Sequence, residues 1–333
     1  MILKLFKVFS PTSLMIIILL TIIFWLKVFF NESGLGLYID QNPLPLYGLV
    51  MDFLNMLNIP FLNKLLALIL VLIQAFLIAA INNQFNLIGR RSFMPSLFFI
   101  LIVFNFTDYL QIHPIYFANI LFLIAWIKIK KAQGKQKALT NYFDASLLIG
   151  LASLFYFNFI YLVFILWINI LISRPGSYKE FSISLFGSLI IWYLFLSFYF
   201  ITYSEHYNIF SLLSFNPGFT DITSLSITTQ IAGIFFILLI FFANFALFRY
   251  YISLNINIRN NLKLLFYLFA LGILIILFTN SSFELIYMIA IPVSLFISLF
   301  FINMKSIFLG NVLLIIAFLI TITNLFFADR IVI

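Results

Sequence analysis

Ten acidic side chains and two histidines are the residues of this 333-residue chain whose types could carry chemistry. Three of the acids, Glu32, Asp40 and Asp52, fall in the stretch 31–60, which is the longest hydrophilic interruption of an otherwise apolar sequence. Carboxylates in such a loop either accept protons in a reaction or are ordinary solvent-exposed side chains with no catalytic role. The loop is therefore the first candidate for a functional site.

The two histidines each have an acid nearby. Asp108 precedes His113 by five residues, and Glu205 is adjacent to His206. Two histidines and two acids could bind a divalent metal ion. However, neither HxxxH nor HxxE spacing occurs, and a histidine before Pro114 can equally cap a helix or form a turn. We predict no cofactor and no metal site, with a divalent metal as the alternative.

Several reaction classes are excluded by residues that the chain lacks. It has no cysteine, so it contains no disulfide, no thiolate nucleophile and no Cys-ligated zinc or iron–sulfur site. Walker, GxSxG and HExxH patterns are also absent. These absences argue against P-loop NTPases, serine hydrolases with a GxSxG nucleophile elbow, and zinc-dependent proteases with an HExxH motif.

The composition is that of a membrane protein. Hydrophobic residues make up 65% of the chain and charged residues 8%, whereas soluble domains carry about 25% charged residues. Such a surface must face lipid rather than water. The net charge of +8 would fit nucleic-acid binding in a soluble protein, but here the basic residues flank apolar runs and act as topology signals. We therefore predict no nucleic-acid partner.

Apolar runs long enough for helices follow one another along the whole chain. A helix needs ~20 apolar residues to cross the ~30 Å hydrocarbon layer, and open sheets cannot satisfy their edges there. The sequence predicts an all-α fold, a polytopic transmembrane helical bundle of about eleven spans in a single transmembrane domain, 1–333. The predicted spans are 10–30, 61–81, 92–107, 113–130, 144–157, 158–173, 181–203, 223–248, 262–279, 284–302 and 306–327.

The basic residues decide how the run 144–173 crosses. If it crosses twice, 15 of the 18 Lys and Arg residues lie on one side, which is then the cytoplasmic side. If it crosses once, the split is 10 to 8. The positive-inside rule favours two crossings, with a tight turn near Phe157–Asn158, the N-terminus inside and the C-terminus outside. The acids then divide unequally too, because eight of the ten lie outside and only Asp144 and Glu180 lie inside.

The second half of the first outer loop has helical periodicity. Leu46, Leu49, Val50, Phe53 and Leu57 recur at helical spacing, after two prolines that can start a helix. Polar residues lie between them. This pattern is typical of an amphipathic helix that lies in the membrane interface with its apolar side in lipid.

These features resemble the C-type (GT-C) superfamily of polyprenyl-linked glycosyltransferases. The likeness comprises a first span, an outer loop that opens with an acid, an interfacial helix after NPLPLYGLV, and a second span. It continues with NNQFNLIGRRSFMPSLFFILIVF, the basic tract WIKIKKAQGKQK and the glycine-containing FDASLLIGLASLFYFNFIYLVFILW. It covers 1–203, with additional spans in 204–333. Along its whole length the chain also resembles an uncharacterised family of bacterial polytopic inner-membrane proteins.

The resemblance implies roles for particular residues. In that superfamily an acid of the first outer loop is the general base that activates the acceptor, and by position it corresponds to Glu32 here, with Asp40 as second choice. The donor is a sugar on a polyprenyl phosphate, whose phosphate needs cations. The candidates for binding this substrate are Lys27, Lys64, His206 and Arg330.

Three functions remain open at this point. The first is glycosyl transfer from a lipid-linked donor at the outer face of the bacterial cytoplasmic membrane. The second is a non-catalytic subunit that docks on other membrane proteins of an envelope complex. The third, less favoured, is a flippase for a lipid-linked substrate, because no internal repeat is visible. Membrane lipids are expected partners in all three. Polar residues inside the spans are expected to join helices: Gln74, Asn105, Asn119, Asn169 and Asn244.

Overall fold

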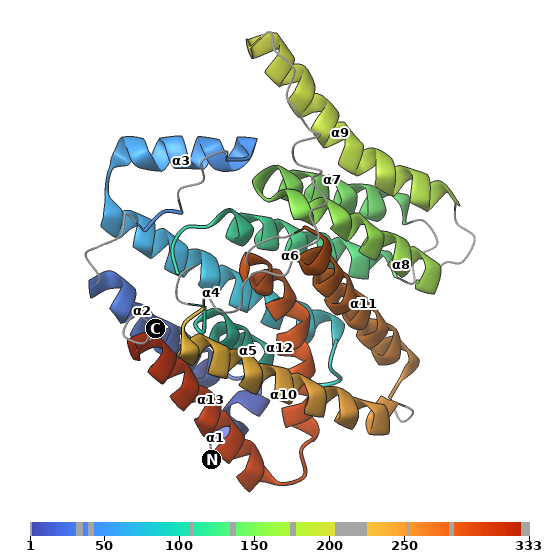
Figure 1. The fold of residues 1–333 in the computed structure, drawn as a ribbon. Coiled ribbons are helices and arrows are strands. Elements are labelled where there is room, and N and C mark those ends of the chain that lie inside the picture. Colours follow the sequence, from blue (N-terminus) through green and yellow to red (C-terminus); the bar gives the residue numbers. More distant parts are fainter. Residues whose placement is uncertain are drawn as a thin grey trace.

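The structure, a computed structural model, is a bundle of helices (Figure 1). It describes residues 2–30, 36–38, 43–106, 110–133, 138–173, 178–203, 225–251, 254–279 and 283–327. Within these ranges there is no β-strand, only an isolated bridge between Leu37 and Ile112. The helices are α1 (Ile2–Lys7), α2 (Pro11–Phe30), α3 (Pro45–Leu57), α4 (Pro60–Phe85), α5 (Met94–Val103), α6 (Pro114–Ala132), α7 (Leu139–Phe155), η2 (Phe157–Leu162), α8 (Val163–Ser173), α9 (Tyr178–Tyr203), α10 (Ile227–Tyr250), α11 (Ile256–Thr279), η6 (Phe283–Leu285), α12 (Ile286–Asn303) and α13 (Ile307–Phe327).

The prediction of an all-helical, polytopic membrane protein is confirmed. Seven described helices are long and apolar enough to cross a bilayer, namely α2, α4, α9, α10, α11, α12 (with η6) and α13. The helices α5, α7 and α8 are apolar but shorter. Eleven spans and the orientation of the termini remain predictions.

Two helices form the centre of the bundle. Every residue of α5 is buried, and 83% of the apolar window of α12 is buried, whereas that share is 28% for α2 and α13. With ten residues, α5 is about 15 Å long, roughly half the thickness of the hydrocarbon layer. Its Ser96 hydroxyl donates to the Ala75 carbonyl oxygen of α4 at 2.5 Å. The run predicted as span 92–107 is therefore a short helix enclosed by other helices.

The ambiguous run 144–173 folds back on itself. Helix α7 ends at Phe155, Tyr156 is extended, and the 3-10 helix η2 leads into α8. The start of α7 lies beside the end of α8, because the Tyr142 hydroxyl accepts a hydrogen bond from Asn169 at 2.9 Å and lies 3.3 Å from the Ser173 hydroxyl. Both ends of this hairpin are consequently on the same side of the bundle, as two crossings require.

The predicted helix of the first outer loop is confirmed, and its exposure shows which side faces outward. Tyr47, Met51 and Leu54 of α3 are buried against the protein. Leu49 and Phe53, on the other side, are exposed. Figure 1 shows α3 lying across the end of the neighbouring helices rather than along them. Of the apolar residues predicted to enter lipid, Leu49, Phe53 and Leu57 are exposed, whereas Leu46 and Val50 are half-buried and Val50 packs against the core.

The polar residues within the spans join helices, as predicted for four of the five. Asn119 of α6 donates to the Gln74 side chain of α4 at 3.1 Å and to the Tyr287 carbonyl oxygen of α12 at 3.2 Å. Asn169 bonds to α7, and Asn105 donates to Thr321 of α13 at 3.1 Å. Asn244 differs, because it lines a cavity.

The densest of these connections surrounds Asn324 of α13. Its side-chain amide donates to the Asn105 carbonyl oxygen at 2.6 Å, and its oxygen accepts hydrogen bonds from Thr228 at 2.7 Å and Thr229 at 3.1 Å. Asn324 and Thr229 are buried. One side chain therefore ties α13 to both α10 and the end of α5.

Replacing Asn324 with Leu is expected to lower the free energy of unfolding by about 1–2 kcal/mol, since it leaves buried donors and acceptors without partners in an apolar environment. Equilibrium unfolding in mixed detergent micelles measures this. The matched control is Thr323→Val on the exposed side of the same helix, where the hydroxyl bonds only to its own helix. Equal stability of the two variants would contradict the role assigned to Asn324.

The face predicted to be cytoplasmic carries closely spaced cations. The Lys7 amine donates to the Ile302 carbonyl oxygen at 3.2 Å, which joins α1 to the end of α12. Burial and, to a lesser extent, the charge of Arg90 lower the pKa of Lys7. Lys128 pairs with Asp144 at 2.7 Å. Apart from Asp144 and Glu180, the inner connections carry no acid in the sequence.

Candidate polar site beneath the first outer loop

The first outer loop is fastened to the start of α6. The Ile112 amide donates to the Gly36 carbonyl oxygen at 2.8 Å, and the Tyr38 amide donates to the Ile112 carbonyl oxygen at 2.9 Å. The buried Tyr47 hydroxyl of α3 lies within donating distance of the carbonyl oxygens of Tyr38, at 2.6 Å, and Ile112, at 3.1 Å. Backbone and α3 together hold the segment 36–38 in place.

Gly36 also brings a cation to this position. Its φ of +67° lies in the left-handed region, which glycine adopts without strain. A Cβ there would lie 2.9 Å from Cγ of Lys64, so the lysine stem packs directly on the glycine. Lys64 is the fifth residue of α4 and is only 7% exposed. The loop backbone and a buried cation are therefore in contact.

His113 and Glu284 meet at the same place. Ring nitrogen Nε2 of His113, which is fully buried, lies 3.5 Å from Oε1 of Glu284, which is 7% exposed. The other ring nitrogen, Nδ1, accepts a hydrogen bond from the Ile115 amide at 3.3 Å and so caps α6. Because Nδ1 accepts, the neutral ring carries its proton on Nε2, facing the carboxylate.

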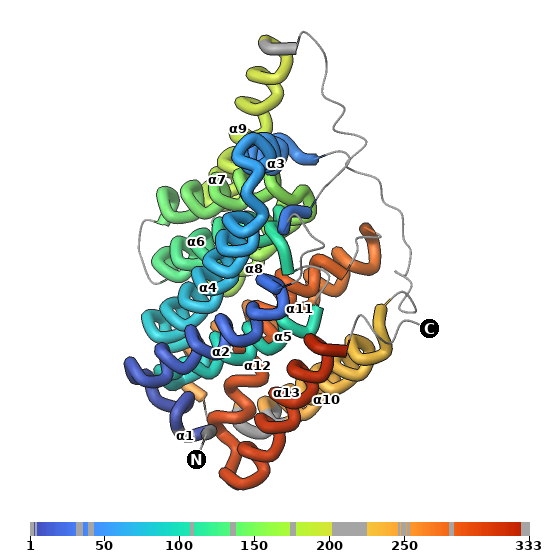
Figure 2. Tube along the Cα trace, turned by 90° about the vertical axis from the view of Figure 1, so that its left-hand side faces the viewer, coloured from blue at the N-terminus to red at the C-terminus, as the bar shows by residue number. Residues whose placement is uncertain are grey.

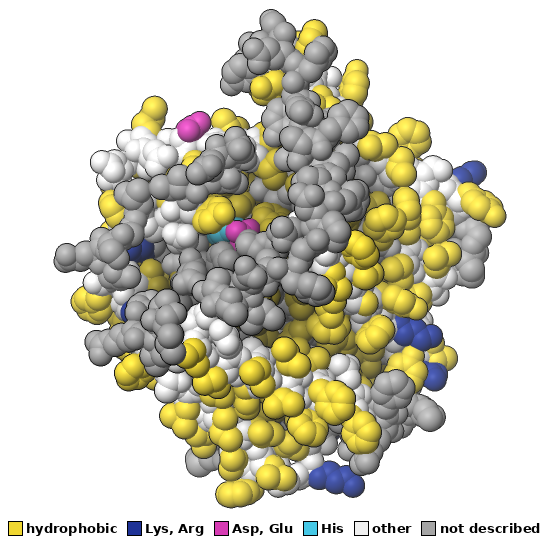
Figure 3. All heavy atoms as spheres, in the orientation of Figure 1, with side chains coloured by type: hydrophobic (Ala, Val, Ile, Leu, Met, Phe, Trp, Pro, Cys, Tyr) yellow, Lys and Arg dark blue, Asp and Glu magenta, His cyan; other side chains and the backbone are white. Residues whose placement is uncertain are grey.

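Tyrosines surround this pair. The Tyr38 ring lies 4.4 Å from the His113 ring between centroids, and the rings of Tyr156 and Tyr116 lie at 6.4 and 6.5 Å. They come from the outer loop, the end of α7 and the first turn of α6. Figure 3 shows a histidine beside an acidic side chain near the centre of the drawn face, with apolar side chains around them. We refer to His113, Glu284, Lys64, Tyr38 and Tyr156 as the polar site.

Not all of the predicted site residues can be placed. Glu32, Asp40, His206 and Arg330 lie outside the described residues. Lys64 is in the polar site. Lys27 lies half-buried in the last turn of α2, whose end contacts the start of α4 through the rings of Phe29 and Phe61 at 5.3 Å.

His113 and Glu284 are two possible metal ligands that the structure brings together. No three His, Asp or Glu side chains gather closely enough within the described ranges to hold a metal ion. His113 and Glu284 are a pair, and Asp108, Glu205 and His206 lie outside those ranges. The prediction that His113 could act as a helix cap is confirmed.

Comparison with known proteins gives no identification. No protein-family model, no curated protein and no solved structure matches this chain. The resemblance to the GT-C superfamily therefore stays a prediction. The function has to be argued from the polar site itself.

Sequence reasoning missed Glu284 as a site residue. This acid is the first residue of the predicted span 284–302. The sequence does contain an indication of its importance, because Glu284 is a single carboxylate between Phe283 and Leu285 at the start of a strongly apolar helix. Carboxylates in such positions are costly and usually face a partner inside the bundle. The partner, His113, is distant in sequence and could not be inferred from spacing.

Proposed function

We propose that this protein is a bacterial cytoplasmic-membrane glycosyltransferase that uses a sugar carried on a polyprenyl phosphate at the outer face. One observation carries the proposal. The segment Gly36–Tyr38, which lies in the sequence between the predicted catalytic acids Glu32 and Asp40, contacts a buried cation and packs beside a histidine–carboxylate pair. Catalytic acids next to the polar site, at the membrane boundary, would suit a substrate whose lipid part stays in the bilayer.

The chemistry assigns one task to each group. Glu32, or else Asp40, accepts the proton of the acceptor hydroxyl, whose oxygen then attacks the anomeric carbon of the sugar. The bond from that carbon to the phosphate oxygen breaks, and the polyprenyl phosphate leaves with the electron pair. Lys64 is the fifth residue of α4, and its positive charge favours a phosphate. Lys27, His206 and Arg330 are the further candidates for this contact.

The proposed topology has eleven crossings, with the N-terminus inside and the C-terminus outside. Two observations support it: the 15-to-3 division of Lys and Arg, and the hairpin of α7 and α8 with both ends on one side. The polar site then lies at the outer ends of α4, α6 and α12. Membrane lipids and the lipid-linked sugar are the expected partners.

Single-cysteine labelling tests this topology, and the chain has no native cysteine to interfere. Cysteines on the cytoplasmic side should resist a membrane-impermeant maleimide in intact cells, and those outside should react. The proposed inner positions are Gly134, Gly176 and Asn257, and the outer ones are Asn216 and Ser281. Reaction at Gly176 from outside would remove the double crossing of 144–173.

A non-catalytic membrane subunit is the second candidate, and α9 favours it. Only 22% of the apolar window of this helix is buried. Figures 1 and 2 both show α9 extending beyond the other helices. Phe186, Tyr193 and Phe198 are exposed along it. A partner helix that packs against this aromatic side would shield it as lipid does.

A transfer assay separates the two candidates. The purified protein is reconstituted in lipid nanodiscs with synthetic polyprenyl-phosphate sugars, and release of polyprenyl phosphate is followed by mass spectrometry. Release above that of empty nanodiscs, abolished by changes in the first outer loop, supports the transferase. No release from any donor, together with co-purification of a partner that is lost when Tyr193 and Phe198 are replaced by Ala, would instead support the subunit.

A further inference from the structure

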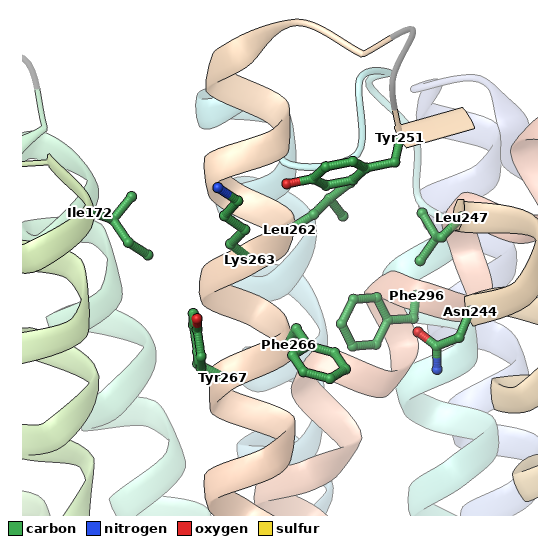
Figure 4. A pocket seen from close by; sticks show the side chains of 9 residues that line it. All are labelled: Ile172, Asn244, Leu247, Tyr251, Leu262, Lys263, Phe266, Tyr267 and Phe296. Atoms are coloured by element: carbon green, nitrogen blue, oxygen red, sulfur yellow. The ribbon is translucent and has the colours of Figure 1, made fainter. Parts of the chain in front are cut away.

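A cavity lies away from the polar site, among α8, α10, α11 and α12. Its volume is about 520 Å³, within the range of small-molecule sites, which is about 300–1,000 Å³. Figure 4 shows the side chains that line it. They come from the end of α8, the last two turns of α10 and the first half of α11, with Phe296 of α12 at the back. None of them belongs to the proposed reaction.

The two ends of this cavity differ in chemistry. Lys263 and Tyr251 provide a cation and a hydroxyl near the connection between α10 and α11, and in Figure 4 their polar ends lie at the same level. Phe266, Phe296 and Leu247 provide an apolar wall below them. The cavity thus has a charged end and an apolar body, which is the chemical pattern of a lipid.

The cavity opens toward the surface that faces lipid. Phe266 and Tyr267 line it and are 53% and 44% exposed, on a helix long and apolar enough to cross the bilayer. The polar end lies toward the connection between α10 and α11, which the distribution of basic residues assigns to the cytoplasmic side. A lipid of the inner leaflet could enter sideways without leaving the membrane.

The charges near the cavity favour lipids with an anionic headgroup. Lys263 is exposed and pairs with no carboxylate of the described residues. Arg259, one helical turn earlier on α11, adds a second cation on that side. Asp144, one of the two acids assigned to the inner side, is occupied by Lys128 at 2.7 Å. The excess positive charge fits a phosphate.

We propose that this cavity binds an anionic phospholipid of the cytoplasmic leaflet. Its phosphate contacts Lys263 and accepts a hydrogen bond from the Tyr251 hydroxyl, and one acyl chain lies against Phe266 and Phe296. Basic pockets between membrane helices on the cytoplasmic side recognise anionic headgroups in this way. The site uses none of the residues of the polar site, so its test does not depend on the proposed transferase activity.

Native mass spectrometry of the detergent-solubilised protein, titrated with phosphatidylglycerol or phosphatidylcholine, tests the proposal. Lys263→Gln should weaken phosphatidylglycerol binding about five-fold, because a Lys near an anionic headgroup contributes about that factor. Phosphatidylcholine binding should change much less, because the choline group cancels the charge of its phosphate. Lys305→Gln is the matched control, since Lys305 is an exposed cation assigned to the same side and does not line the cavity.

A second variant tests the acyl chain. Leu247→Trp adds volume inside the cavity and should reduce phosphatidylglycerol binding even though every cation is retained. Unchanged binding by folded Leu247→Trp protein would place the lipid outside the cavity and overturn the proposal. So would equal phosphatidylglycerol affinities for Lys263→Gln and Lys305→Gln. Because Lys263 is exposed, the first variant should fold normally and keeps the test decisive if Leu247→Trp does not fold.

Discussion

Replacing Glu32 with Gln is expected to lower the rate of glycosyl transfer by about 10²–10⁴-fold, the usual loss when a general base is removed. Glutamine has nearly the same size and can still form hydrogen bonds, but it cannot accept the proton of the acceptor hydroxyl. The nanodisc assay for released polyprenyl phosphate measures the effect. Donor binding should change much less than the rate, since the carboxylate acts on the acceptor.

The matched control for Glu32→Gln is Asp52→Asn. Asp52 is also a carboxylate of the first outer loop, but it is exposed on α3. This variant should retain full activity. The free energy of unfolding should be similar for both variants, because a loop carboxylate near water contributes little. Full transfer activity in the double variant Glu32→Gln with Asp40→Asn would rule out both acids and favour the non-catalytic subunit.

Replacing Gly187 with Val is expected to lower the free energy of unfolding by about 1–3 kcal/mol, the usual cost of overpacking a tight interface. A Cβ at Gly187 would collide with the Ser146 side chain of α7 and lie 3.0 Å from the Phe143 carbonyl oxygen. Close approach of small residues is what drives helix association in lipid, where burial of apolar surface contributes little. Unfolding in mixed detergent micelles, with α7–α9 crosslinking as a second readout, measures the loss.

Gly233→Val provides the control for this helix interface. Gly233 lies in the interior of α10, and a Cβ there would meet no atom within 4 Å. The valine should therefore cost little beyond any difference in helix propensity. Equal stability of Gly187→Val and Gly233→Val would show that α7 and α9 can separate or adjust without cost.

The same packing gives a structural meaning to the glycine-containing stretch in α7. That stretch contributed to the GT-C resemblance. In the structure Gly150 faces α9, and a Cβ there would lie 3.0 Å from the Ser188 carbonyl oxygen. The residue is small because two helices meet at it. A small residue in this segment therefore indicates helix packing as readily as a shared reaction.

The sequence predicts the helical class and several elements because lipid imposes strong constraints. Apolar runs in a bilayer must be helices, and the helix of the first outer loop and the reversal within 144–173 follow from periodicity and charge. What it cannot predict is which helices lie at the centre. Lipid and protein interior are equally apolar. The buried Met94–Val103 of α5 and the more exposed Ile307–Phe327 of α13 therefore have similarly apolar sequences.

The polar site was predictable only in part, for a related reason. The loop and its acids are visible in the sequence, as is Lys64. The contact between His113 and Glu284 is not, since it depends on how α6 and α12 pack, and their apolar surfaces carry no periodic signal for that arrangement. Tyr38 and Tyr156 belong to the site through the same packing. Glu32 and Asp40 lie outside the described residues, so their position relative to this pair remains a prediction.

The central position of α12 has a consequence for biogenesis. This helix fills the middle of the bundle against α5, yet the ribosome synthesises it long after α5. During translation, α5 is therefore made long before α12, its main neighbour at the centre of the bundle. The final packing of α5 thus requires α12, and the contact between His113 and Glu284 can form only once the segment that leads into α12 is in place.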